Sequence, residues 1–106
     1  PFTIKAMDVR EMLAEKIRAL EMRGKERDLY DVFILFKKGI EPDMGLIEKK
    51  LGLHGKKLSI KTIETHIQAM EKTWETEMKK LMNSPPDFSL VSQQVLDKLK
   101  TAITLG

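Results

Sequence analysis

The stretch Asp8–Gly39 reads DVREMLAEKIRALEMRGKERDLYDVFILFKKG and determines the fold class. It predicts two helices joined by a short turn at Gly24. Asp8 is a favourable N-cap residue, and Glu11, three residues later, completes a capping-box pattern. Gly24 and Gly39 can adopt the left-handed backbone conformation that ends helices. Because the connection is so short, the two helices are expected to run roughly antiparallel.

The first of these helices carries a lysine on its apolar side. At about 100° per residue, its apolar side chains fall on one arc. They are Val9, Met12, Leu13, Ile17 and Leu20. Lys16 projects from the middle of the arc, and Arg23 lies further along it. A lysine in this position must extend to water, pair with an acid or point into a pocket.

The second helix is apolar nearly all round, which predicts that it is buried. Its large apolar residues are Tyr30, Val32, Phe33, Ile34, Leu35 and Phe36. Asp28 and Asp31 nevertheless lie in its first turns, and buried carboxylates need cationic or hydrogen-bonding partners. We expect the Lys16 ammonium to contact Asp28 or Asp31, with Arg23 or Arg27 sharing the acids. The pattern fits a structural ion-pair cluster favoured by the helix N-terminus, and it also fits the floor of a polar active site.

Two motifs in this stretch resemble a known family. Residues 14–20 read AEKIRAL, residues 23–25 read RGK, and residues 27–31 read RDLYD. These strings are similar to the third and fourth motifs of the AbiEii family, which are abortive-infection toxins of the nucleotidyltransferase superfamily. The pairing of the two motifs is specific. Elsewhere the resemblance is a run of helices with a similar Trp and Pro-Pro-x-Phe ending.

The resemblance implies catalytic roles for Lys16 and Asp28. It implies substrate binding by four further side chains: Arg23, Arg27, Tyr30 and Asp31. The family has a Gly-rich motif on a sheet and an Asp-x-Asp metal motif before these residues. The chain has no Gly-Ser, Gly-Gly or Asp-x-Asp pair, so the resemblance implies a single helical domain, 1–106, that forms the C-terminal part of a larger protein.

On this view the chain alone is inactive and holds no metal or other cofactor. The whole enzyme would use Mg²⁺ and a nucleoside triphosphate, because metal-assisted phosphoryl transfer needs carboxylates to hold the ions. The partners implied are the missing N-terminal nucleotidyltransferase domain, RNA and an antitoxin protein.

The composition limits the size of the domain and the classes of function that are open to it. A chain of 106 residues has room for one domain with a modest core. The formal net charge of +3 is too small to indicate nucleic-acid binding by itself. The absence of cysteine excludes a disulfide framework and a thiolate metal site, and it fits a reducing cytoplasm. No apolar run approaches the roughly 18 residues needed to span a bilayer. Phe2–Lys5 alternates apolar and polar residues and is expected to be a short extended arm.

Three more helices are predicted after Gly39. Asp43 caps a short helix from Met44 to about Leu51. Ser59 caps the longest helix, Ile60 to about Met82, with one apolar stripe that places Trp74 in the core: Ile60, Ile63, Ile67, Met70, Trp74, Met78 and Leu81. Asp87 or Ser89 caps the last helix, which has its own stripe: Phe88, Val91, Val95, Leu99, Ala102 and Ile103. Five helices predict a compact all-α bundle, with one core that includes Phe33, Phe36, Ile67, Met70 and Trp74.

One clearly basic patch surrounds the loop after the short helix. It contains Lys49, Lys50, Lys56, Lys57 and Lys61, with only Glu48 nearby. Such a patch is either a solvated rim or a phosphate or RNA contact. No aromatic residue is interleaved to stack on a base, which argues against a platform for single strands. His54 and His66 have no second ligand at zinc spacing, so no metal site is predicted.

Two other classes of function remain open. Leu46–Leu53 followed by Ser59–Ile67 resembles the two helices of a DNA-binding helix-turn-helix. The residues His54–Leu58 form an extra insert where a turn of three or four residues belongs. The remaining class is a plain helical protein-interaction domain with no chemistry.

Overall fold

The computed structural model describes residues 8–105, which form six helices and no strand. The helices are α1 (Val9–Met22), α2 (Glu26–Lys37), α3 (Met44–Gly52), α4 (Ile60–Ala69), α5 (Trp74–Lys79) and α6 (Phe88–Leu105). The predicted all-α class is therefore confirmed for this part of the chain. The arm predicted at Phe2–Lys5 lies outside the described residues.

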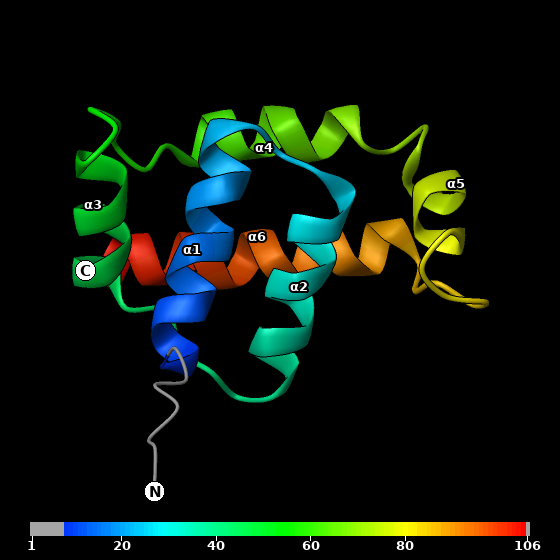
Figure 1. Cartoon of the computed structure of the whole chain (residues 1–106), viewed down its shortest axis with the longest axis horizontal. Helices are drawn as coiled ribbons and strands as arrows, with labels where there is room; N and C mark the ends of the chain where they lie inside the picture. The colour runs from blue at the N-terminus through cyan, green and yellow to red at the C-terminus, as the bar shows by residue number, and fades with distance from the viewer. Residues whose placement is uncertain (1–7, 106) are drawn as a thin grey trace, which may run out of the picture.

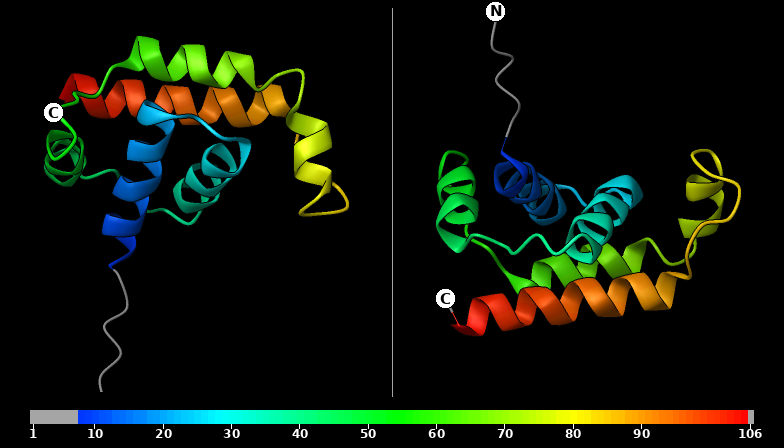
Figure 2. Two further views of the ribbon diagram at one scale, coloured as in Figure 1. Left: turned by 45° about the horizontal axis from the view of Figure 1, so that its top comes forward. Right: turned by 90° about the horizontal axis from the view of Figure 1, so that it is seen from below.

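The helices are arranged in two layers. α1 and α2 run side by side in opposite directions, and α6 passes behind both of them (Figure 1). Figure 2 shows α4 and α6 running antiparallel as the second layer. α3 packs beside α1 at one end of the molecule, and α5 packs against α2 at the other. This arrangement leaves one side of the α1–α2 pair open.

Side chains at the predicted N-cap positions cap the N-termini of four helices. Asp8 accepts a hydrogen bond from the Arg10 amide at 2.8 Å, and Asp43 accepts one from the Leu46 amide at 3.1 Å. The Ser59 hydroxyl accepts from the Thr62 amide, and Asp87 accepts from the Leu90 amide, both at 3.2 Å. Each bond satisfies an amide that the first helical turn leaves without a partner. Of the two residues considered for the last helix, Asp87 is the cap.

The core lies between the two layers and draws on every helix. Its fully buried large residues are Leu13, Ile17, Leu20, Leu29, Val32, Ile47, Leu51, Ile63, Ile67, Met78, Val91 and Leu99. Phe33, Met70 and Trp74 are buried with them, as predicted, whereas Phe36 is only partly buried against the cluster. The Trp74 indole Nε1 donates to the Pro86 carbonyl at 2.9 Å, and its ring lies 5.6 Å from that of Phe88.

The prediction of one helix from Ile60 to Met82 is wrong. α4 ends at Ala69, a turn follows, and α5 begins at Trp74 and packs against α2. The Thr73 hydroxyl in this turn donates to a Glu26 carboxylate oxygen on α2 at 2.5 Å. The apolar stripe could not reveal the bend, because Met70, Trp74 and Met78 are buried on both sides of it.

Four residues expected on buried stripes are exposed. Val9 and Met12 are 49% and 39% exposed, and Leu81 and Ile103 are 51% and 36% exposed. Val9, Leu81 and Ile103 lie at or beyond the ends of helices, where no neighbouring helix covers them. Met12 lies on the open side of the α1–α2 pair. Lys16 therefore lies at the edge of the buried face of α1 and not in its middle.

Candidate functional site

The turn between α1 and α2 brings the two motifs together. The backbone amides of Arg23 and Gly24 both donate to the Ala19 carbonyl, at 2.9 and 3.0 Å. Gly24 has a φ of +63°, the left-handed conformation that only glycine adopts at low cost. A Cβ atom at Gly24 would also lie 2.5 Å from the Cβ of His66 on α4. The turn therefore requires glycine for its backbone and for its contact with α4.

Two ion pairs link α1 to α2 through motif residues. The Lys16 Nζ lies 2.8 Å from Asp31 Oδ2, and the Arg23 Nε lies 3.4 Å from Asp28 Oδ2. The expected contact of Lys16 with one of the two acids is confirmed, and its partner is Asp31. Asp28, which the resemblance paired with Lys16 in catalysis, is held by Arg23. Four motif side chains thus form two ion pairs between α1 and α2, which we name together the Lys16–Asp31 cluster.

The members of this cluster differ in burial. The Asp28 side chain is 5% exposed, whereas the Lys16 and Asp31 side chains are 32% and 30% exposed and Arg23 is 63% exposed. Partly exposed ion pairs contribute little to folding, about 0–1 kcal/mol. The cations of the cluster therefore remain accessible to an anionic ligand. Stability alone gives little reason for the Lys16–Asp31 pair, whereas Arg23 partners the buried Asp28 carboxylate.

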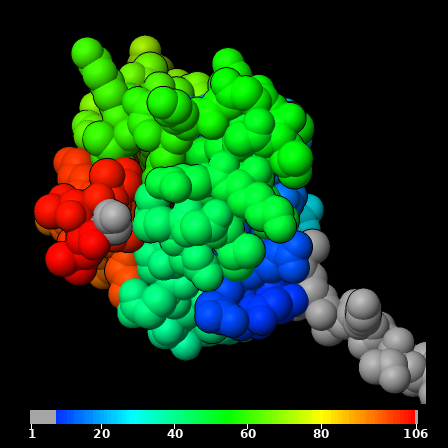
Figure 3. Space-filling model, turned by 90° about the vertical axis from the view of Figure 1, so that its left-hand side faces the viewer, coloured from blue at the N-terminus to red at the C-terminus, as the bar shows by residue number. Residues whose placement is uncertain are grey.

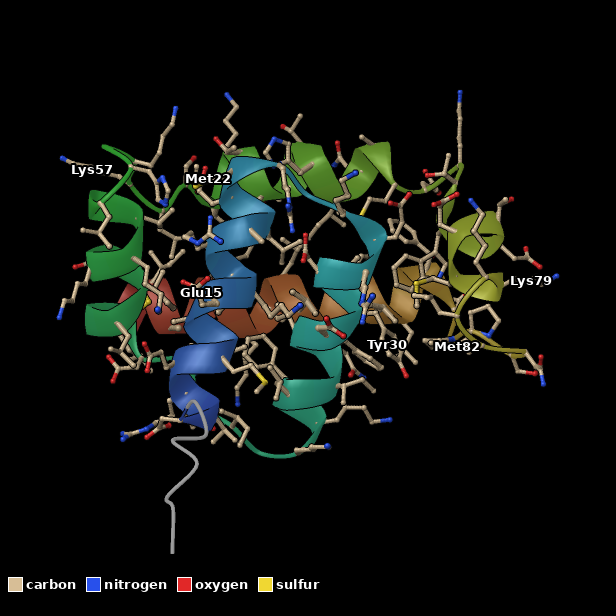
Figure 4. All side chains as sticks on the ribbon, in the orientation of Figure 1. Glu15, Met22, Tyr30, Lys57, Lys79 and Met82 are labelled. Carbon is tan, nitrogen blue, oxygen red and sulfur yellow. The ribbon has the colours of Figure 1, made fainter. Side chains whose placement is uncertain are left out.

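Arg27 and Tyr30 form no ion pair or side-chain hydrogen bond with the cluster in the described part of the chain. Arg27 is exposed and, with Glu26 and Glu77, lines a small hollow between α2 and α5. Tyr30 is half-buried and projects from the side of α2 nearer α5 (Figure 4). Of these two predicted substrate-binding residues, Arg27 lies one helical turn before Asp31 without pairing with it, and Tyr30 lies towards α5 (Figure 4).

A second polar junction, which the sequence did not reveal, joins α1 to α4. Glu21 is 7% exposed, and its carboxylate accepts a hydrogen bond from the Ser59 amide at 2.5 Å. Burial raises the pKa of the Glu21 carboxyl, although the Ser59 amide acts in the opposite direction. His66 Nδ1 lies 2.7 Å from the Leu20 carbonyl oxygen. The only sequence signal for Glu21 is its position one turn after Ile17, at the edge of the apolar arc.

Lys50 lies apart from the other lysines of the predicted basic patch. Its Nζ lies 3.3 Å from Glu11 and 3.0 Å from Glu15, so it ties α3 to α1. Glu11 thus pairs with a lysine of α3, although its spacing suggested a capping box with Asp8. Lys50 lowers the pKa of the Glu15 carboxyl, and Glu15 raises the pKa of the Lys50 ammonium. Glu15 of the first motif therefore has a structural contact.

The four other lysines of the patch, Lys49, Lys56, Lys57 and Lys61, are exposed. Within residues 8–105, no three His, Asp or Glu side chains lie close enough together to hold a metal ion. None of the helices described is both long and apolar enough to cross a membrane.

The chain matches the family model "Nucleotidyl transferase AbiEii toxin, Type IV TA system" over residues 1–101. This chain belongs to the AbiEii toxin family. The match reaches far beyond the two motifs that first suggested it and includes the helices around them. The AbiEii description names the toxin of a toxin–antitoxin system, which implies an antitoxin counterpart. No curated protein and no solved structure matches the chain.

The geometry of α3 and α4 differs from that of a helix-turn-helix. The two helices are separated by residues 53–59, and α3 packs on α1. In a helix-turn-helix the connecting turn has three or four residues, and the second helix is presented to the major groove. The family match and this geometry both favour the AbiEii assignment for the whole chain.

Proposed function

We propose that this AbiEii chain is the helical part of a cytoplasmic nucleotidyltransferase toxin, and that its Lys16–Asp31 cluster forms one wall of a nucleotide site. An N-terminal nucleotidyltransferase domain would complete that site. Lys16 and Asp28 would act at the reacting phosphates, with Arg23 and Asp31 holding them in position. The chain alone would be inactive.

One observation carries this proposal. Lys16 and Asp31 come from two separate AbiEii motifs, and their charged atoms lie 2.8 Å apart at a partly exposed surface. Arg23 and Asp28 add a second pair across the same two helices. Val9 and Met12, exposed on the same side of α1, provide an apolar margin against which another domain could pack.

The residues of the cluster fit a triphosphate better than they fit a metal ion. Lys16 and the largely exposed Arg23 offer cationic donors of the kind that bind phosphate oxygens. Each carboxylate already faces a cation, so Asp28 and Asp31 do not form a free pair of metal ligands. When Mg²⁺ is bound it neutralises charge on the phosphates, and in this proposal the N-terminal domain holds it.

The test joins this chain to the nucleotidyltransferase segment of an AbiEii protein. Transfer of each labelled ribonucleoside triphosphate to total RNA is measured with Mg²⁺ for the joined protein and for the chain alone. We expect transfer by the joined protein only. Lys16→Met is expected to lower the rate by about 100-fold or more, as loss of a charge-stabilising group does in other enzymes.

The matched control is Lys38→Met, which removes an exposed lysine just after α2. It is expected to leave transfer unchanged. Full activity of Lys16→Met would contradict the role of the cluster. Absence of transfer by the joined protein would favour a plain helical interaction domain.

A further inference from the structure

Positive charge is concentrated in one segment of the molecule. Residues 44–61 contain five lysines and one glutamate, a formal charge of +4, whereas the whole chain carries +3. The remainder of the chain is therefore slightly negative. Such an asymmetry produces a local positive potential even when the net charge is small.

One of these five lysines is held in ion pairs, and the other four are not. Lys50 is 16% exposed and bound to two glutamates of α1. Lys49, Lys56, Lys57 and Lys61 are exposed and form no ion pair within the described part of the chain. Their charges are therefore available to an external anion.

These lysines lie on a projecting edge of the molecule. Figure 3 shows α3 and the α3–α4 loop standing out on this face, and Figure 4 shows Lys57 pointing away from the body of the protein. The edge continues to the α1–α2 turn, because Glu21 binds the Ser59 amide and His66 binds the Leu20 carbonyl. Lys25, exposed beyond that turn, lines the hollow between α2 and α5 and is not part of the edge.

We infer that this edge, the basic surface formed by Lys49, Lys56, Lys57 and Lys61, binds the phosphate backbone of a nucleic-acid duplex. Lysine ammonium groups bind phosphates as point charges. The segment 44–61 has no Phe, Tyr or Trp side chain, so it offers the bases of a single strand no large aromatic platform. α3 and α4 lack helix-turn-helix geometry, so contact is with the backbone and not with base edges. This inference does not depend on the proposed nucleotidyltransferase activity.

The test uses the 106-residue chain and fluorescein-labelled hairpins of 16 base pairs, one of RNA and one of DNA with the same sequence. Binding is followed by fluorescence anisotropy between 20 and 200 mM KCl. The variant Lys56→Gln/Lys57→Gln/Lys61→Gln is compared with the matched control Lys37→Gln/Lys38→Gln/Lys72→Gln. The control removes three exposed lysines from other parts of the surface.

We expect the first triple variant to bind about tenfold or more weakly at low salt, and the control to bind like the wild type. The slope of log K against log [KCl] is expected to fall in magnitude by about one for each phosphate that the variant no longer neutralises. Binding to both hairpins, or to RNA alone, supports the inference. It is overturned by absence of binding at 20 mM KCl or by equal losses in the two variants. Circular dichroism spectra confirm that both variants are folded, and loss of nucleotide transfer in Lys16→Met has no bearing on this result.

Discussion

The α1–α2 pair and the corner between α5 and α6 are held together by different interactions. Across the open side of α1 and α2, the contacts are ion pairs: Lys16 with Asp31, both partly exposed, and the exposed Arg23 with the buried Asp28. At the α5–α6 corner, Trp74 is buried, donates to the Pro86 carbonyl and packs against the ring of Phe88.

This difference predicts that substitutions in the two regions change different properties, stability at the corner and activity at the open side. Burial of a large aromatic side chain stabilises a small domain by several kcal/mol, whereas partly exposed ion pairs contribute little. The corner is therefore where substitutions are expected to unfold the domain. The open side of the α1–α2 pair is where they are expected to change activity and leave the fold intact.

The largest loss of stability is expected at the corner. Trp74→Ala removes a side chain that is 3% exposed together with its hydrogen bond to Pro86. We expect it to lower the free energy of unfolding by roughly 3–5 kcal/mol in a denaturant titration. Leu90→Ala, at a residue of α6 that is 46% exposed, is the control and is expected to cost well under 1 kcal/mol. A loss below about 1 kcal/mol for Trp74→Ala would show that the corner is not a main source of stability.

An intermediate loss is expected at the turn of the α1–α2 pair. Gly24→Ala places a Cβ on a residue with a φ of +63° and against His66. We expect a cost of about 1–3 kcal/mol, measured by thermal unfolding. Gly52→Ala in α3 is the matched control, because a Cβ there meets nothing within 4 Å. The control is expected to be neutral or stabilising, and equal effects at the two glycines would disprove the strain at Gly24.

A smaller contrast is expected between the two lysines whose ion pairs join α1 to a neighbouring helix. Lys50 is 16% exposed and faces two glutamates, whereas Lys16 is 32% exposed and faces one aspartate. We expect Lys50→Met to cost about 1 kcal/mol and Lys16→Met to change stability by less than about 0.5 kcal/mol. Chemical denaturation of the two variants in parallel measures the difference. A larger cost for Lys16→Met would show that the Lys16–Asp31 cluster is needed for folding.

The smallest effect concerns pH. Burial raises the pKa of Glu21 above its ordinary value of 4.5, so the folded state binds this proton more tightly than the unfolded state does. The protonated Glu21 carboxyl contributes its full stabilisation below about pH 4.5, and this stabilisation is lost as the pH rises through the folded-state pKa. Glu21→Gln keeps an acceptor for the Ser59 amide without the charge, so its melting temperature at pH 7 is expected to equal or exceed that of the wild type.

Melting temperatures of both proteins at pH 4 and pH 7 provide the check. Glu15, whose pKa is lowered by Lys50, has the opposite dependence, with stability lost as pH falls below the ordinary value. Glu15 is present in the wild type and in the variant, so its contribution to stability cancels when their melting temperatures are subtracted. The quantity to compare is the melting temperature of Glu21→Gln minus that of the wild type. If this difference is smaller at pH 7 than at pH 4, the effect of burial on Glu21 is contradicted.

Local chemistry predicted most of the fold. Asp8, Asp43 and Ser59 are N-caps, and Gly24 and Gly39 have positive φ, because caps and left-handed turns depend on the residue itself. The break between α4 and α5 was not predictable, since the apolar stripe continues across it and a contact from Thr73 to α2 accompanies it.

Only part of the candidate site was predictable, because local chemistry is visible in the sequence and long-range contacts are not. The short turn at Gly24 restricted Lys16 to the acids of α2, so the contact with Asp31 could be expected. Which acid each cation binds depends on the rotation of both helices, which periodicity does not determine. The partners of Glu21 and Lys50 lie more than 30 residues away in sequence, at Ser59 for Glu21 and at Glu11 and Glu15 for Lys50, and no local pattern indicates them.

The position of α6 has a consequence for synthesis on the ribosome. α6 is made after the other five helices of the described part of the chain, and it covers faces of α2 and α4 that are made much earlier. Until it emerges, the apolar faces of α2 and α4 that pack against it cannot complete their burial. A nascent chain that stalls before Phe88 therefore exposes apolar surface that chaperones and proteases recognise. Stalled translation would thus yield a degradable fragment instead of a folded toxin domain.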